Sequence, residues 1–144
     1  MANKTHATEW LEKAYHDLDS ARLLFEAGHF TDTIGYLLHQ SIEKIFKSSL
    51  AYQNVPIVKT HNLIELNELL DDFVDLNHDE ITLLAIATTY HTKQRYPSPH
   101  KRLPSNEEIK AILEFANFLM ETVVQKLNID HEKIKNSVQD EEKK

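Results

Sequence analysis

The chain has 144 residues, the size of one ordinary domain, and a formal net charge of −7. This negative charge argues against a general nucleic-acid coat protein, because sequence-independent binding depends on neutralising phosphates, but it does not exclude a local basic site. Cysteine is absent from the sequence, which excludes disulfides, thiolate metal sites and cysteine nucleophiles and fits a reducing, cytoplasmic setting.

The N-terminal segment is polar and lacks the apolar core of a signal peptide. The most apolar run, residues 81–87, is much shorter than the roughly 18 residues that a membrane-spanning helix needs. We therefore expect a soluble, cytoplasmic protein with no membrane association.

Apolar side chains recur every three or four residues through the first two segments, which is the pattern of amphipathic helices. In the first segment these positions are Leu11, Ala14, Leu18, Ala21 and Phe25. Gly28 is predicted to follow the end of this helix, because that position favours a positive φ. The second helix is predicted to begin near Thr31 or Asp32, either of which can cap it, and to run to about Tyr52.

Start and stop signals also mark a third and a fourth helix. Asn62 begins the third, and Glu65 follows three residues later in an arrangement that resembles a capping box. The fourth is predicted to start between Asn77 and Asp79. It must stop before Pro97, because the residue that precedes a proline is disfavoured in the α conformation.

The fifth predicted helix has the clearest start signal, with Ser105 as the cap and Glu108 three residues later. Residues 129–144 are rich in charge, and we expect a frayed or disordered tail there. No alternating strand-like pattern appears, and the connections are short. The sequence therefore predicts an all-α fold, an antiparallel up-and-down bundle of four to five helices over residues 1–128.

Three segments occur in an order that is shared with a known family. Residues 17–30 form a helical stretch that ends in a glycine followed shortly by an aromatic residue. Residues 39–50 lead to Lys-Thr-His-Asn-Leu at 59–63, and Arg-Tyr-Pro stands at 95–97. Together they resemble the HEPN (higher eukaryotes and prokaryotes nucleotide-binding) family, over about residues 8–127. The Arg-Tyr-Pro motif is similar to the one that closes the fourth helix in a large prokaryotic branch.

Residues 91–102 gather basic side chains in an otherwise acidic chain. The candidate phosphate ligands here are Lys93, Arg95, Lys101 and Arg102, with Tyr96 as a candidate for stacking on a nucleobase. Arginine offers a planar fork to a phosphate, and lysine offers a mobile point charge. The alternative is a solvated loop whose charges offset the acidic surface elsewhere.

Arg95 and His100 have the spacing Arg-x4-His. The resemblance implies a catalytic role for this pair, because RNase members of the family carry Arg-x4-6-His and cleave RNA without a metal. A histidine can move the proton of a 2′-hydroxyl while an arginine stabilises charge on the phosphate. Three departures oppose this role. Arg102 stands two positions after His100, where toxin-type members often have a tyrosine. Tyr96 stands where nucleolytic members usually have a small polar or charged residue, and Pro97 and Pro99 prevent a shared helical face.

A second candidate site is a polar strip on the second predicted helix. Its members are His39, Gln40, Glu43, Lys44 and Lys47. We expect His39 and Lys44 to bind nucleotide or phosphate, whereas Glu43 and Lys47 fit an ordinary ion pair on a surface face. His61 precedes the third helix, whose N-terminus can hold an anion. The alternative for His61 is a structural role in the preceding loop.

The nine histidines are scattered, without a His-x3-His or His-Glu-x2-His pair, and we predict no metal site and no cofactor. The resemblance implies a module that binds a nucleotide or RNA phosphate, acts as a homodimer, and works beside a minimal nucleotidyltransferase in a toxin–antitoxin type of system. A metal-independent endoribonuclease that uses Arg95 and His100 is the first alternative. A pure protein-interaction module is the second.

Overall fold

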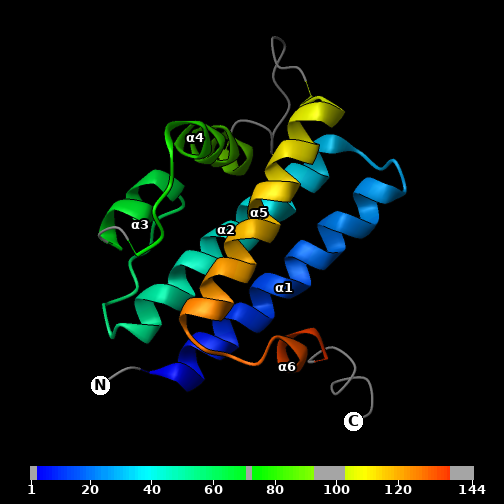
Figure 1. The fold of residues 1–144 in the computed structure, drawn as a ribbon. Coiled ribbons are helices and arrows are strands. Elements are labelled where there is room, and N and C mark those ends of the chain that lie inside the picture. The colour runs from blue at the N-terminus through cyan, green and yellow to red at the C-terminus, as the bar shows by residue number, and fades with distance from the viewer. Residues whose placement is uncertain (1–2, 71–72, 93–102, 137–144) are drawn as a thin grey trace.

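The computed structural model describes residues 3–70, 73–92 and 103–136. Within these ranges the chain forms only helices and turns (Figure 1). In order, the helices are α1 (Lys4–Glu26), α2 (Thr31–Tyr52), α3 (Leu63–Leu69), α4 (His78–Thr92), α5 (Asn106–Lys126) and α6 (His131–Lys135). The predicted all-α helical bundle is confirmed. None of the described helices has the length and apolar character needed to cross a membrane.

Helix α2 is the centre of the bundle, because it packs against α1, α3, α4 and α5. In Figure 1, α1, α2 and α5 run alongside one another, and α3 and α4 lie together to one side of them. The apolar residues of α2, among them Leu38, Ile42 and Phe46, have no exposed surface. Several polar residues of α2 are buried as well: His39, Ser41, Glu43, Lys47, Ser48 and Ser49. Buried polar groups need hydrogen-bond partners, and those partners define the site described below.

Side-chain caps fix where α3 and α4 begin. The Asn62 side chain accepts from the backbone N–H groups of Ile64 and Glu65, as the sequence predicts. The capping box there is incomplete, because the Glu65 carboxylate accepts from the hydroxyl of Thr60. A complete box opens α4, where Asn77 and Glu80 each accept from the backbone N–H of the other.

The start of α5 is tied to α4. Ser105 caps α5 by accepting from the backbone N–H of Glu108, as predicted. The Glu108 carboxylate accepts from the hydroxyl of the buried Tyr90 on α4 and so links the two helices. Gly35 on α2 makes room for the Tyr90 ring, because a Cβ added there would lie 3.1 Å from two ring carbons. Helices α2, α4 and α5 therefore meet around Tyr90.

The connection between α1 and α2 agrees with the sequence except at one cap. Gly28 follows the end of α1 with a φ of 72°, as predicted. Helix α2 runs from Thr31 to Tyr52, but its N-cap is Phe30, which makes no side-chain cap hydrogen bond. Neither residue that the sequence offers as its cap occupies that position.

The segment after α5 corrects one expectation. Residues 129–136, placed by the sequence in a frayed tail, form a turn and the short helix α6. The Asp130 carboxylate caps α6 by accepting from the backbone N–H of Glu132, and Ile134 is fully buried. Helix α6 packs against α1. Two buried isoleucines, Ile129 and Ile134, anchor a segment whose composition alone indicates a solvated tail. Residues 137–144 lie outside the described ranges.

Candidate functional site

Three histidines from different parts of the chain meet in the structure: His39 on α2, His61 just before α3, and His91 near the end of α4. The rings of His61 and His91 are stacked with their centroids 3.9 Å apart. The ring centroid of His39 lies 5.0 Å from that of His91, and Tyr36 stacks on His91 at 6.0 Å. We call His39, His61 and His91 the histidine cluster.

Packing between helices brings the histidine cluster together. Helices α3 and α4 both pack on α2 and on each other. The backbone N–H of Leu63, the first residue of α3, donates to the Thr88 hydroxyl of α4 at 3.2 Å. This bond holds the segment that carries His61 against the turn of α4 that carries His91. The sequence names His39 and His61 as site candidates, and the structure places both in one cluster.

Glu43 connects His61 to Lys47. Its Oε1 atom lies 2.8 Å from Nδ1 of His61, and its Oε2 atom accepts from Nζ of Lys47 at 2.9 Å. The Glu43 residue is 5% exposed and the Lys47 residue 8%. Burial alone would raise the pKa of Glu43, but the hydrogen bonds from His61 and Lys47 outweigh it and lower that pKa. The carboxylate is therefore ionised at neutral pH, and because it can only accept, Nδ1 of His61 donates.

The sequence predicts a Glu43–Lys47 ion pair on an ordinary surface face. The ion pair is confirmed, but the predicted position on the surface is wrong, because both residues are buried. Surface ion pairs of this kind contribute only a few tenths of a kcal/mol, whereas a buried pair must compensate for the desolvation of two charges. The positions of these two buried side chains are therefore determined by the packing around α2.

His39 positions His61 by a hydrogen bond to the backbone carbonyl of His61. Its Nε2 atom lies 2.7 Å from the carbonyl oxygen of His61, and since a carbonyl only accepts, Nε2 carries the proton. Burial lowers the pKa of His39 despite this hydrogen bond, so the ring is neutral at pH 7. No described residue hydrogen-bonds its Nδ1 atom. With no exposed surface, His39 serves the cluster by holding residue 61 in place.

Lys44 faces a different neighbour. Lys44 lies five positions after His39, which corresponds to a rotation of about 140° around α2. There the Nζ atom of Lys44 donates to the Asp17 carboxylate of α1 at 2.6 Å. A phosphate at this lysine would share its ammonium group with the Asp17 carboxylate, whose negative charge repels an anion. The structure therefore brings His39 and His61 together and directs Lys44 towards α1.

The remaining candidates lie outside the described residues. They are Lys93, Arg95, Tyr96, His100, Lys101 and Arg102. The chain enters this basic segment directly after His91 and Thr92, so the histidine cluster stands at its start. His91 is missed as a cluster member by sequence reasoning. Its position immediately ahead of the basic segment is the signal that could have identified it.

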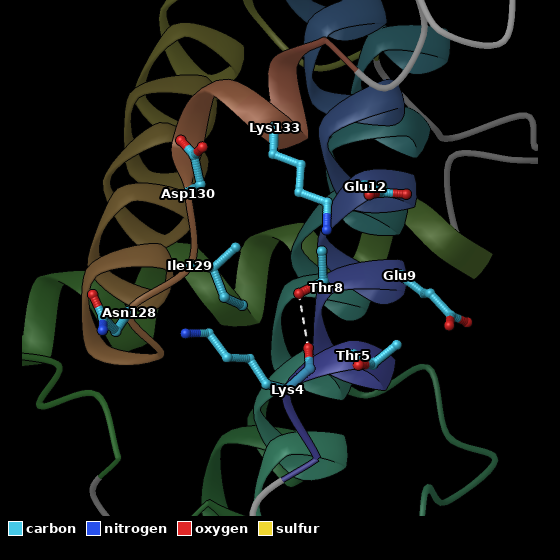
Figure 2. Close-up of a pocket in the computed structure, with 9 residues that line it drawn as sticks. All are labelled: Lys4, Thr5, Thr8, Glu9, Glu12, Asn128, Ile129, Asp130 and Lys133. Carbon is cyan, nitrogen blue, oxygen red and sulfur yellow. Dashed lines mark hydrogen bonds between the residues drawn. The ribbon is translucent and has the colours of Figure 1, made fainter.

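A separate hollow of about 450 Å³ lies between α1 and the connection from α5 to α6 (Figure 2). It is lined by Lys4, Thr5, Thr8, Glu9, Glu12, Asn128, Ile129, Asp130 and Lys133. The Thr8 hydroxyl donates to the Lys4 carbonyl at 2.7 Å, and the side chain of Lys133 extends towards them. Basic and acidic residues mix around this hollow, so its charges select no ligand. It contains none of the site residues that the sequence predicts.

The described part of the chain contains no preformed metal site. No group of three or more His, Asp or Glu side chains there is arranged to hold a metal ion. Although three imidazoles come close together, two of them are stacked face to face, which is not the arrangement of ligands around one ion.

The model of the HEPN domain matches residues 7–127. The fold is similar to the crystal structure of TT1696 from Thermus thermophilus, with a TM-score of 0.72, 23% identity, and coverage of 84% of this chain and 98% of that one. It is also similar to ST0689, an archaeal HEPN homologue, with a TM-score of 0.65, 18% identity, and coverage of 85% and 98%. No curated protein matches the sequence. The family model spans nearly all of the described bundle, and the chain belongs to the HEPN domain family.

Proposed function

We propose that this protein binds a nucleotide or an RNA phosphate where the histidine cluster meets the basic segment 93–102. The observation that carries the proposal is the position of the cluster. His61 and His91 are stacked at the end of α4, and the chain runs from there directly into the most basic stretch of an acidic protein. Family membership supports the same ligand class, since the resemblance stated above implies nucleotide or RNA binding.

In this proposal, the basic segment binds the negatively charged phosphate of the ligand. Around His61 the charges of Lys47 and Glu43 offset one another, so the cluster itself offers no net positive charge. Lys93, Arg95, Lys101 and Arg102 are the phosphate ligands in this proposal, and Tyr96 stacks on a base. Arg95 is the central member, because its guanidinium can hold two phosphate oxygens at once.

Charge reversal tests the binding claim. Arg95→Glu is expected to weaken the binding of a ten-nucleotide uridine RNA at least tenfold, because a bidentate cation is replaced by a repelling anion. Lys110→Glu, at an exposed position on α5, makes the same change of net charge and serves as the control. Binding is followed by the fluorescence of the single tryptophan, Trp10. Nζ of Lys47 lies 5.8 Å from the Trp10 ring centroid and also forms the ion pair with Glu43, so Lys47 links Trp10 to the histidine cluster. Equal affinities of the Arg95→Glu variant and the wild type would favour a pure protein-interaction module.

We also propose a homodimer that works with a minimal nucleotidyltransferase, as the family resemblance implies. Light scattering on the purified chain should then give twice the 16.8 kDa mass of one copy. Co-expression with a nucleotidyltransferase encoded beside it should yield one complex on gel filtration. A monomer, or two proteins that elute separately, would contradict these two parts of the proposal.

The alternative function, a metal-independent endoribonuclease, is favoured by the Arg-x4-His spacing of Arg95 and His100. RNA incubated with the protein and EDTA should then be cleaved. Cleavage at an unchanged rate by the His100→Ala variant would remove His100 from the mechanism.

A further inference from the structure

We propose that the histidine cluster is a pH-sensitive switch, which holds the segment before α3 on α2 at neutral pH and releases it when His39 takes up a proton. The inference goes beyond the proposed function, because it requires no ligand. It uses only contacts among residues that the structure describes.

Three contacts hold residue 61 against its neighbours. Nε2 of His39 donates to the His61 carbonyl at 2.7 Å, Nδ1 of His61 donates to Glu43 at 2.8 Å, and the His61 ring stacks on that of His91. Only the first of these contacts is made to the backbone of residue 61. The position of the segment before α3 therefore depends on the His39 ring.

The surroundings of His39 fit a neutral ring and not a charged one. Nε2 carries the proton, so Nδ1 carries the lone pair, and Nδ1 is buried without a hydrogen-bond partner among the described residues. A proton added to Nδ1 would place a positive charge and a donor without an acceptor in a site with no exposed surface. A protonated His39 is therefore stable only where Nδ1 can reach water.

Nδ1 can reach water only if the groups that cover His39 move. Two of these groups come from outside α2: the His61 ring, with its centroid 6.3 Å from that of His39, and the His91 ring, at 5.0 Å. Both lie at the edge of the α3–α4 pair, whereas Tyr90 packs deeper, against Gly35 of α2. We therefore expect a local opening at the histidine cluster, with the rest of the bundle in place.

The charges that face His39 come from α2, from the segment before α3 and from α4. Burial disfavours the charged ring most, the Glu43 carboxylate favours it, and charges on His91 and His61 oppose it. Lys47 is bound to the other oxygen of Glu43. Helices α1 and α5 also pack on α2, but their described residues place no charge that acts on His39. Burial prevails, and it lowers the pKa of His39.

The direction of the switch follows from this lowered pKa. In the open state the His39 ring is in water, where the pKa of an imidazole is about 6.5. The open state therefore binds more protons than the closed state below about pH 6.5, and acidification favours opening. Above that pH both states are neutral and the closed state keeps its full stability. Glu43 stays ionised across this range, because its hydrogen bonds to His61 and Lys47 outweigh burial and lower its pKa.

The consequence is that pH controls access to the buried polar face of α2. In the closed state His39 has no exposed surface, and Glu43 and Lys47 are less than a tenth exposed. Release of the segment before α3 removes the imidazole that bonds to Glu43 and uncovers these three side chains together.

The test is NMR of the purified protein at pH 7.5 and pH 5.5. Nuclear Overhauser contacts from the ring of residue 39 to His61 and His91 should be present at pH 7.5 and lost at pH 5.5. The contact of Gly35 with the Tyr90 ring should persist at both values, because α4 stays packed on α2. Loss of the Gly35–Tyr90 contact together with the others would indicate general acid unfolding and overturn the inference.

His39→Gln removes the titration but keeps a side-chain N–H that can donate to the His61 carbonyl. In this variant residue 39 should stay in contact with His61 and His91 at pH 5.5. His78→Gln makes the same chemical change at an exposed position at the other end of α4, and it should open like the wild type. Opening of the His39→Gln variant at pH 5.5 would remove His39 from the switch.

The wild type supplies an independent measurement if the His39→Gln variant does not fold. The ¹³Cε1 shift of the His39 ring reports its charge, and the loss of its contacts should follow that shift with the same midpoint, below about pH 6.5. Contacts that persist at pH 5.5, or a His39 ring that becomes charged while it stays in contact with His61 and His91, would overturn the inference.

Discussion

Lys47 and Glu43 form a buried ion pair in which each charge depends on the other. Each is less than a tenth exposed, and the lysine ammonium also lies over the ring of Trp10. Removing one partner of such a pair leaves an uncompensated buried charge, which costs more than the pair itself contributes. The pair therefore restrains α2 and, through Glu43, the ring of His61.

Lys47→Met is expected to lower the free energy of unfolding by about 3 kcal/mol, because it leaves the Glu43 carboxylate buried without its cation. Lys44→Met is the matched control on the same helix. Its side chain and that of its partner Asp17 are 26% and 21% exposed, and we expect a loss of about 1 kcal/mol or less. Urea denaturation measures both. Similar losses would show that Glu43 does not depend on Lys47.

At the scale of elements, the two glycines have different functions. Gly28 follows the end of α1 with a φ of 72°, and nothing lies within 4 Å of a Cβ built there. Gly35 lies inside α2 with an ordinary backbone, and there an added Cβ would meet the Tyr90 ring at 3.1 Å. The first glycine is required by backbone conformation, and the second by the close approach of α4.

Gly28→Ala is expected to cost about 1–2 kcal/mol of stability through the strained backbone alone, and to leave RNA binding unchanged. Gly35→Ala should displace the Tyr90 ring, weaken its hydrogen bond to Glu108 and shift the end of α4 that carries His91. Thermal unfolding and RNA affinity, measured on both variants, separate the two effects. An RNA affinity that falls for Gly28→Ala and not for Gly35→Ala would contradict this assignment.

The helices themselves could be predicted from local signals. Apolar spacing, the cap of Asn62 and the cap of Ser105 are properties of short stretches of sequence, and the structure reproduces them. The capping box of Asn77 and Glu80 is also a local sequence signal, although it is not among the caps predicted above. Helix α6 was not predicted, because a single apolar side chain in a charged segment gives no periodic signal.

At the scale of the whole molecule, the site depends on contacts between distant segments, which one-dimensional patterns do not specify. His39, His61 and His91 are 22 and 30 residues apart in sequence, and they meet because α3 and α4 both pack on α2. The burial of Glu43 and Lys47 also follows from neighbours on several sides of α2. One local signal was available. The apolar stripe on the second predicted helix is broad, which is typical of a helix that is covered on more than one side.

The central claim is that a nucleotide or RNA phosphate binds where the histidine cluster meets the basic segment 93–102. Long-range ¹H–¹⁵N NMR of the histidine rings tests this most directly, because it reports the tautomer of each ring and its response to ligand. Free protein should show His61 protonated on Nδ1, as its contact with Glu43 requires. Addition of 2′-O-methyl uridine ten-mer should shift its Nε2 signal and leave that of the exposed His78 unchanged. A His61 ring that is protonated on Nε2, or that does not respond while His78 shifts, would contradict the account.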